Sequence, residues 1–363
     1  MNPRPIHPQP AIADLHRVRD PGSDHHRYVC LDRNERLSPL PPWFTEKVRS
    51  RISSDLLTQY PYQNEFLSLL AQKVGLPENM VLLASGSDAG IKALFQAYVG
   101  AGDRVVMLDP SYAMLPIYAQ MFEARTVRVG FGGDLVVNEE SLLEAVVAGV
   151  RLVVLANPNQ PTGTLLGQET IRRVTVRAAE IGALVAIDEA YYPFSDETVL
   201  PLIKDHPNLL VLRTFSKASG LAGLRIGWVA GESEIVRNLF KVRSAHDVNS
   251  AAMLCAGLIL EHPEIVNGYK AEVKEGARVL GERARQLGLF PLPTHTNFLL
   301  IRVAHRVDPR RLVETLKALG YLVKGPFESP CIADCIRVTL GPPELMLQFA
   351  RCLESALTPT ACS

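Results

Sequence analysis

The chain has 363 residues, a formal net charge of +0 at pH 7 and a pI of about 7.1. This length exceeds one ordinary domain, and 47% hydrophobic with 21% charged residues is typical of a globular enzyme. The balanced charge gives no electrostatic support for a nucleic-acid partner. No apolar run reaches the roughly 18 residues of a membrane helix, and the N-terminus lacks the pattern of a signal peptide. We therefore expect a cytoplasmic protein with no membrane partner.

The cysteines and histidines predict no metal site. The chain has 6 cysteines, of which only Cys331 and Cys335 lie close together. A lone C-x3-C spacing lacks the second ligand pair that a zinc site needs. The adjacent His25 and His26 are typical of a solvated loop.

Residues 1–28 are rich in Pro, His and Asp, without periodicity, and predict a flexible arm. Between about residues 80 and 230, apolar runs typical of strands alternate with amphipathic helical patterns such as 88–99. The runs cover 80–84, 104–108, 152–156, 184–187 and 209–212. Near-continuous apolar strands separated by helices predict an α/β fold with a mostly parallel sheet covered on both faces.

The pattern changes after about residue 260. A long charged helix is predicted over 269–287, a strand over 297–302, a helix over 309–319, and strands over 322–324 and 335–339. This is the pattern of a smaller α+β domain. We therefore expect a large domain over 29–260 and a small C-terminal domain over 261–363.

Polar or small residues follow each of the five apolar runs, at positions 85–88, 109–112, 157–163, 188–191 and 216–217. Any one of these segments is typical of a turn or a helix cap. In an open parallel sheet, however, ligands bind beyond the carboxyl ends of the strands. Five such segments in order therefore indicate one functional site.

Lys217 is the most informative residue of this predicted site. It follows an apolar run inside a Ser/Gly-rich loop, and Arg225 comes eight residues later. A lysine in a pocket that desolvates it can form a Schiff base with a carbonyl, and an arginine fork suits a phosphate. This combination predicts a seat for pyridoxal 5'-phosphate (PLP), with Lys217 carrying the cofactor.

The other strand ends supply residues for the remaining parts of the cofactor. Asp188 would keep the pyridine nitrogen protonated, which makes the ring a stronger electron sink. Asn157 and Tyr191 would hydrogen-bond the phenolic oxygen, and Tyr112 would stack on the ring. The phosphate would be held by residues next to the first and last of the five runs: Ser87, the backbone of Asp88, Thr214, Ser216 and Arg225.

With these motifs laid out, the chain from about residue 30 onward resembles fold-type I PLP enzymes, in particular the histidinol-phosphate aminotransferase-like group. The most specific segments are 157–163, 188–192 and 214–227. The resemblance implies that Lys217 is the Schiff-base lysine, Asp188 is the pyridinium partner and Arg337 anchors the substrate carboxylate or its counterpart. It also implies a homodimer in which Tyr60 reaches the cofactor phosphate of the neighbouring subunit. The first part of the large domain would then contribute to dimer contacts and to the small domain.

Three departures from the group's usual pattern concern the substrate. Lys324 stands where members acting on histidinol phosphate typically carry an arginine that meets the substrate phosphate, and lysine lacks the bidentate fork. The N-terminal segment, usually Leu-x-x-Asn-Glu-Asn-Pro, keeps Asn34 but places Arg36 near the predicted substrate entrance. The segment 246–249 also differs. An anionic amino donor would suit Lys324, Arg36 and Arg337, although exposed strand and loop charges would explain Lys324 and Arg36 equally well.

The leading hypothesis is an aminotransferase that moves an amino group between an anionic donor and an α-keto acid. Lys217 would move a proton between the donor's α-carbon and the cofactor. One alternative is a PLP-dependent decarboxylase of an O-phosphorylated amino acid, which breaks a different bond. The other is a PLP-binding regulator without turnover, but residues before 30 are too few for the DNA-binding domain that such proteins carry.

Overall fold

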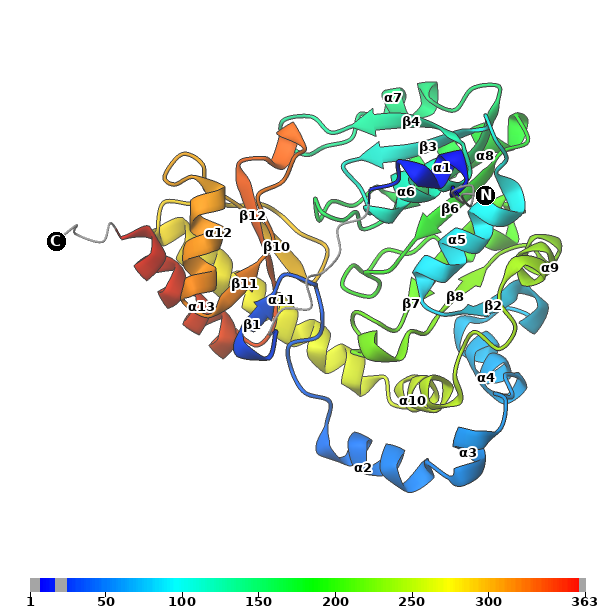
Figure 1. Ribbon diagram of the computed structural model, residues 1–363, viewed down its shortest axis with the longest axis horizontal. Coiled ribbons are helices and arrows are strands. Elements are labelled where there is room, and N and C mark those ends of the chain that lie inside the picture. The colour runs from blue at the N-terminus through cyan, green and yellow to red at the C-terminus, as the bar shows by residue number, and fades with distance from the viewer. Residues whose placement is uncertain (1–6, 17–24, 359–363) are drawn as a thin grey trace, which may run out of the picture.

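Seven strands form the central sheet in the computed structural model, which describes residues 7–16 and 25–358 (Figure 1). Their order across the sheet is β2-β8-β7-β6-β5-β3-β4. Strand β8 runs antiparallel to both neighbours, and the other pairs are parallel. The strands are β2 (Val81–Ala84), β3 (Arg104–Asp109), β4 (Arg125–Gly130), β5 (Val150–Ala156), β6 (Leu184–Asp188), β7 (Leu209–Thr214) and β8 (Gly227–Ala230).

Helices cover both faces of this sheet because its strands are apolar on both sides. In β5, Leu152 and Val154 pack into the core beneath α5, α6 and α9, and Val153 and Leu155 pack into the opposite core, beneath α4, α8 and α10. The helices of the large domain are α2 (Pro42–Arg51), α3 (Ser54–Thr58), α4 (Asn64–Val74), α5 (Ser87–Tyr98), α6 (Met114–Met121), α7 (Glu139–Glu144), α8 (Gln168–Glu180), α9 (Ser233–Val242) and α10 (Ser250–Glu261).

The small domain packs helices against two small sheets. An antiparallel sheet has the order β12-β10-β9, and β1 pairs in parallel with β11. Across the two domains, short 3-10 helices occur at His25–Arg27, Glu78–Met80, Leu200–Lys204, Ala222–Leu224 and Pro330–Ile332. The elements of the small domain are β1 (Val29–Leu31), α11 (Glu264–Gln286), β9 (Phe290–Pro291), β10 (Phe298–Arg302), α12 (Pro309–Ala318), β11 (Tyr321–Val323), β12 (Cys335–Thr339) and α13 (Pro343–Leu357).

The predicted α/β class with a mostly parallel sheet is confirmed, and the five predicted runs coincide with β2, β3, β5, β6 and β7. The predicted domain boundary at 260/261 lies a few residues before the crossing between domains. That crossing is inside α11, where Ile265 packs in the large-domain core and Tyr269 packs in the small-domain core (Figure 1).

The predicted arm is only partly within the structure. Residues 1–6 and 17–24 lie outside the described residues, but α1 (Pro10–Ala13) is a short helix that contacts α6. The segment therefore contains local structure that its composition did not predict. Among the described residues, every helix is too short or too polar to traverse a lipid bilayer.

Candidate active site

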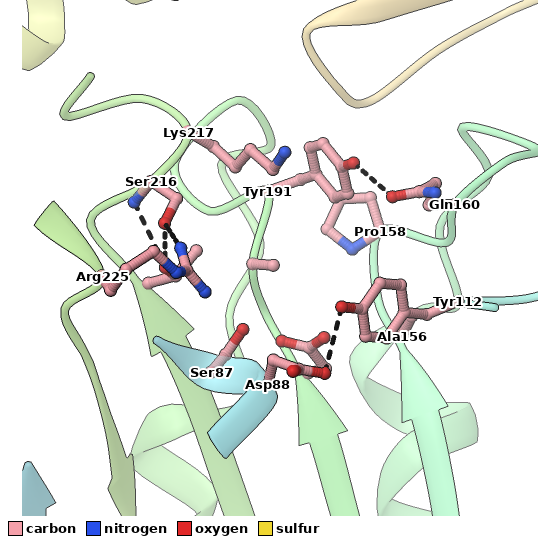
Figure 2. A pocket seen from close by; sticks show the side chains of 13 residues that line it. Ser87, Asp88, Tyr112, Ala156, Pro158, Gln160, Tyr191, Ser216, Lys217 and Arg225 are labelled. Carbon is pink, nitrogen blue, oxygen red and sulfur yellow. Dashed lines mark hydrogen bonds between the residues drawn. The ribbon is translucent and has the colours of Figure 1, made fainter. Parts of the chain in front are cut away.

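A cavity of about 190 Å³ opens at the carboxyl ends of β5, β6 and β7, beside the N-terminus of α5 (Figure 2). Its position is the one that a parallel sheet favours for ligands. The residues that line it are Ser87, Asp88, Tyr112, Ala156, Pro158, Gln160, Asp188, Ala190, Tyr191, Thr214, Ser216, Lys217 and Arg225. The structure thus gathers most of the residues predicted from the five strand ends, while the described residues contain no cluster suited to a metal ion.

Lys217 extends into this cavity from the loop after β7, with its amine directed toward Tyr191 (Figure 2). Its Nζ donates a hydrogen bond to the backbone carbonyl of Arg33 at 3.2 Å and lies 5.8 Å from the centre of the Tyr191 ring. Burial, together with the positive charges of Arg337 and Arg225, lowers the pKa of Lys217 to about 8. More of the amine is therefore unprotonated near neutral pH than in an exposed lysine, which suits a nucleophile or a general base.

Asp188 ends β6 and is buried, with 6% of its surface exposed. Its Oδ1 has no hydrogen-bond partner among the described residues. Burial, together with the nearby charge of Asp88, raises the pKa of Asp188 to about 7. A buried carboxylate oxygen without a partner, lining a cavity, is suited to receive a hydrogen bond from a protonated ring nitrogen.

The N-terminus of α5 and the loop after β7 form an anion-binding cradle. Arg225 Nη1 donates to Ser216 Oγ at 3.1 Å, and Thr214 Oγ1 donates to the same oxygen at 2.9 Å. A Cβ built on Gly86 would lie 2.5 Å from Arg225 Nη2, so a side chain at this position would displace the guanidinium from its place beside the helix. The free N–H groups and positive dipole of the helix end, together with the guanidinium, suit a phosphate.

Asp88 is fixed at the floor of the cavity by two tyrosines. Tyr112 OH donates to its Oδ1 at 3.1 Å and Tyr118 OH donates to its Oδ2 at 2.9 Å. Burial, followed by the charge of Asp88, raises the pKa of Tyr112, so this phenol stays protonated. The Tyr112 ring is therefore held at the cavity wall, where it was predicted to stack on the cofactor.

The Tyr191 hydroxyl lies in the middle of a hydrogen-bonded chain. Asn34 Nδ2 donates to it at 2.8 Å, and the hydroxyl donates to Gln160 Oε1, also at 2.8 Å (Figure 2). Asn157 was predicted to occupy this region but does not line the cavity. Its Oδ1 accepts from Leu166 N at 2.7 Å and its Nδ2 donates to Leu166 O at 3.0 Å. Asn157 therefore closes its own loop, and Gln160, which the sequence analysis did not select, is the amide beside Tyr191.

Comparison with known proteins identifies the family. The sequence profile of the family described as aminotransferase class I and II matches residues 29–353. The chain belongs to this aminotransferase family. It is 31% identical over 333 residues to histidinol-phosphate aminotransferase 1 of Carboxydothermus hydrogenoformans, covering 91% of this chain and 93% of the relative. It is 34% identical over 343 residues to histidinol-phosphate aminotransferase 2 of Cupriavidus pinatubonensis, with 92% of each chain covered.

A solved structure agrees with the sequence relatives. The histidinol-phosphate aminotransferase of Sinorhizobium meliloti, in complex with pyridoxal 5'-phosphate, superposes with a TM-score of 0.86 at 26% identity. The superposition covers 96% of this chain and 97% of the other. The prediction of an aminotransferase is confirmed, and none of these relatives supports the decarboxylase or regulator alternatives.

The cofactor of this aminotransferase is PLP, and the cavity has the groups to receive it. The unpartnered Oδ1 of Asp188 suits the pyridine nitrogen, and the cradle at Gly86 and Arg225 suits the phosphate. Lys217 lines the same cavity. These features belong to the chain's own side chains and backbone, so the fit does not depend on the relatives.

None of the four residues predicted to contact the substrate lines the aminotransferase cavity: Asn34, Arg36, Lys324 and Arg337. Arg337 on β12 is buried, donates from Nη2 to Asp32 O at 2.8 Å and leaves its Nε without a partner among the described residues. Lys324 is exposed, and its backbone forms a two-way hydrogen-bonded bridge with Arg337, at 3.0 and 2.8 Å. Residues paired in this way project from the same face of the strands.

Arg36 and Tyr60 do not line the cavity either. The Arg36 guanidinium donates to the backbone carbonyls of Ser38, Ala218 and Ile265. Tyr60 is 77% exposed and stacks on His246, with ring centres 4.7 Å apart. Within this subunit, then, neither side chain is placed where the predicted ligand contact would be made.

Proposed function

We propose that this aminotransferase takes its amino group from a phosphorylated or acidic amine, with histidinol phosphate as the first candidate, and passes it to an α-keto acid. The observation that carries the proposal is the pair of cations at the Lys324–Arg337 bridge, which project from the same face of the strands. Arg337 is 4% exposed, and its Nε has no hydrogen-bond partner among the described residues, which suits a carboxylate or a phosphate oxygen. The names of the relatives point to the same donor.

The chain's own residues would divide the work as follows. Bound PLP supplies an electron sink for the negative charge that develops at the donor's α-carbon. Lys217, with its lowered pKa, would take the α-proton and return it, and Asp188 would hold the ring nitrogen in its protonated form. Tyr191 and Gln160 would orient the phenolic side of the ring. Arg337 would fix the donor so that its α-carbon faces Lys217.

We also infer that the enzyme is a cytoplasmic homodimer. A groove of about 590 Å³ lies between α3, α4 and α10, and Leu57, Tyr60 and Tyr62 beside it are 69%, 77% and 83% exposed. Exposed apolar and aromatic side chains of this kind are typical of an interface. A second copy seated there would bring Tyr60 toward the partner's phosphate cradle. The free thiols of Cys255 and Cys335 suit a reducing compartment.

The substrate proposal is tested by titrating L-histidinol phosphate into the PLP-loaded protein and recording the visible spectrum. We expect the absorbance of the lysine-bound cofactor to disappear and to return when 2-oxoglutarate is added. L-histidinol, which lacks the phosphate, is the matched control, and its half-saturating concentration should be at least about tenfold higher because the charged hydrogen bonds are lost. Equal response to both amines would remove the phosphate from the proposal.

A further inference from the structure

Arg36 joins three segments that are distant in the sequence. It belongs to the strap, residues 32–37, which leads from β1 toward α2. Its Nε donates to Ser38 O at 3.1 Å, and its Nη1 donates to Ala218 O at 3.3 Å and to Ile265 O at 3.2 Å. The guanidinium lies over the Tyr269 ring, 4.4 Å from its centre. These three hydrogen bonds of the side chain all end on backbone carbonyls.

The loop that carries Lys217 is shaped around the stem of Arg36. Gly220 N donates to Lys217 O at 3.0 Å, which closes a tight turn in which Gly220 has a φ of +75°. A Cβ built on Gly220 would lie 2.5 Å from Arg36 Cδ. Arg36 therefore contacts the turn at two places. Its guanidinium donates to the Ala218 carbonyl, and its aliphatic stem lies against Gly220.

We propose that Arg36 is a positioning residue for Lys217, which braces the backbone directly after the lysine against the first turn of α11. The inference rests on the proposed role of Lys217 as the cofactor lysine. Ile265 and Tyr269 lie where α11 crosses from the large into the small domain, so the brace also ties the lysine loop to the junction between domains. Because Arg36 does not line the cavity, this role replaces the predicted contact with the substrate.

The positioning role requires the planar guanidinium group, which offers several donors in a fixed geometry. Two different nitrogens of Arg36 reach carbonyls on different segments while the guanidinium lies over the Tyr269 ring. Lysine would keep the charge but replace the fork by a single ammonium. Methionine would keep most of the stem that fills the space beside Gly220 and remove the donors.

The test compares Arg36→Met and Arg36→Lys with the exposed control Arg278→Met, whose arginine pairs with Glu275 and Glu282 on the surface of α11. The first measurement is the rate at which cofactor-free protein captures added PLP, followed by visible absorbance across a pH series. We expect Arg36→Met and Arg36→Lys to slow capture by about tenfold or more, because a displaced reacting group costs rate. The pH midpoint should stay unchanged, because the pKa of Lys217 is shifted first by burial and then by the charges of Arg337, Glu35, Arg225 and Asp188, not by the charge of Arg36.

The second measurement is kcat/KM with L-histidinol phosphate and with L-histidinol. A positioning role predicts the same fractional loss for both donors in both variants. Wild-type capture combined with a raised KM for the phosphorylated donor alone would overturn the inference and restore Arg36 as a substrate ligand. Wild-type capture with only a lower Tm would also overturn it, and if Arg36→Met does not fold, Arg36→Lys decides. A wild-type protein that captures no PLP would instead refute the role of Lys217 itself.

Discussion

Lys217 and Asp188 show how burial prepares the site residue by residue. Burial is the largest cause in both cases, and it lowers the pKa of Lys217 to about 8 and raises that of Asp188 to about 7. Each pKa shift shows that the charged form of the side chain is less favourable in the folded protein than in water. Ionisation of either group therefore lowers the free energy of unfolding. Perturbed groups facing one cavity are a hallmark of catalytic sites.

Asp188→Asn should stabilise the cofactor-free protein at alkaline pH. The raised pKa of Asp188 means that the folded chain binds this proton more tightly than the unfolded chain does. The carboxyl's contribution to stability is therefore full below pH 3.8, the ordinary pKa, and is lost as the pH rises through about 7. At pH 8 the variant's free energy of unfolding should exceed that of the wild type, by at most roughly 4 kcal/mol.

Urea unfolding at pH 8 and pH 4 checks this expectation, with the exposed Asp205→Asn as control. The difference between Asp188→Asn and wild type should vanish at pH 4. A variant less stable than wild type at pH 8 would contradict the assignment. With PLP added, the same variant should lose turnover, because the amide cannot keep the ring nitrogen protonated.

Lys217→Ala should fold normally and lose catalysis. We expect turnover to fall by about 10²- to 10⁴-fold, the usual contribution of a positioned general base. The exposed Lys241→Ala, which removes a lysine that donates a hydrogen bond to Asn238, serves as control and should keep full activity. Borohydride treatment followed by peptide mass analysis should label Lys217 in the wild type. Full turnover of Lys217→Ala with bound cofactor would refute the assignment.

At the scale of single elements, the arrangement of Arg225 beside the N-terminus of α5 depends on the glycine that precedes the helix. Gly86 has a φ of +84°, and an added Cβ would meet Arg225. Gly86→Ala should therefore raise the dissociation constant of PLP by about tenfold to a hundredfold, since a phosphate contact worth about 1.5–3 kcal/mol is displaced.

Gly75→Ala is the matched control for this prediction. Gly75 ends α4 with a φ of +70°, and an added Cβ would meet nothing within 4 Å. Both glycines have a positive φ, but Gly75 lies in the left-handed helical region with a ψ of 34° and Gly86 in an extended region with a ψ of 163° that essentially only glycine adopts. Of the two variants, Gly86→Ala is the one that also obstructs the cradle. Fluorescence titration with PLP should show a near-normal dissociation constant for Gly75→Ala. Equal losses in the two variants would mean that strain alone is responsible.

Elements were predictable from the sequence where a local pattern determines them. The buried strands β5, β6 and β7 were predicted because they are continuous apolar runs. Strands β4 and β8 were not predicted: β4 carries Arg125 and Arg128 at the sheet edge, and β8 has only four residues. Gln160 was not predicted because Asn157 is the amide residue that follows the strand directly. No local pattern shows that the side-chain amide of Asn157 forms its hydrogen bonds with the backbone of Leu166 instead. The partners of Arg36 come from residues 218 and 265, so its role required the tertiary structure.

At the scale of the whole molecule, the proposed dimer makes each site depend on two chains. Tyr60 would serve the partner's cradle, and Lys217 serves its own cavity. If so, Tyr60→Ala and Lys217→Ala homodimers should both be poorly active, but mixing them under subunit exchange should restore up to about a quarter of wild-type activity through hybrids with one intact site. Steady-state assays of the mixture, with sedimentation to establish the dimer, provide the measurement.

Two outcomes would contradict this arrangement. Activity in the mixture no higher than the mean of the two parents would mean that Tyr60 acts within its own subunit or not at all. A protein that sediments as a monomer while fully active would remove the interface altogether. Trp43→Ala, at an exposed aromatic residue outside the groove lining, serves as the control variant in the exchange experiment.

The pairing of β2 with β8 has a consequence for synthesis on the ribosome. Strand β2 joins the sheet only through β8, so residues 81–84 wait for residues 227–230 to emerge. The helix end that cradles phosphate follows β2 directly, and Arg225 precedes β8. A nascent chain halted before residue 227 would therefore lack a completed cradle, whatever its length of folded parallel sheet. Cofactor binding would therefore indicate that β8, the last strand of the large domain, has been inserted into the sheet.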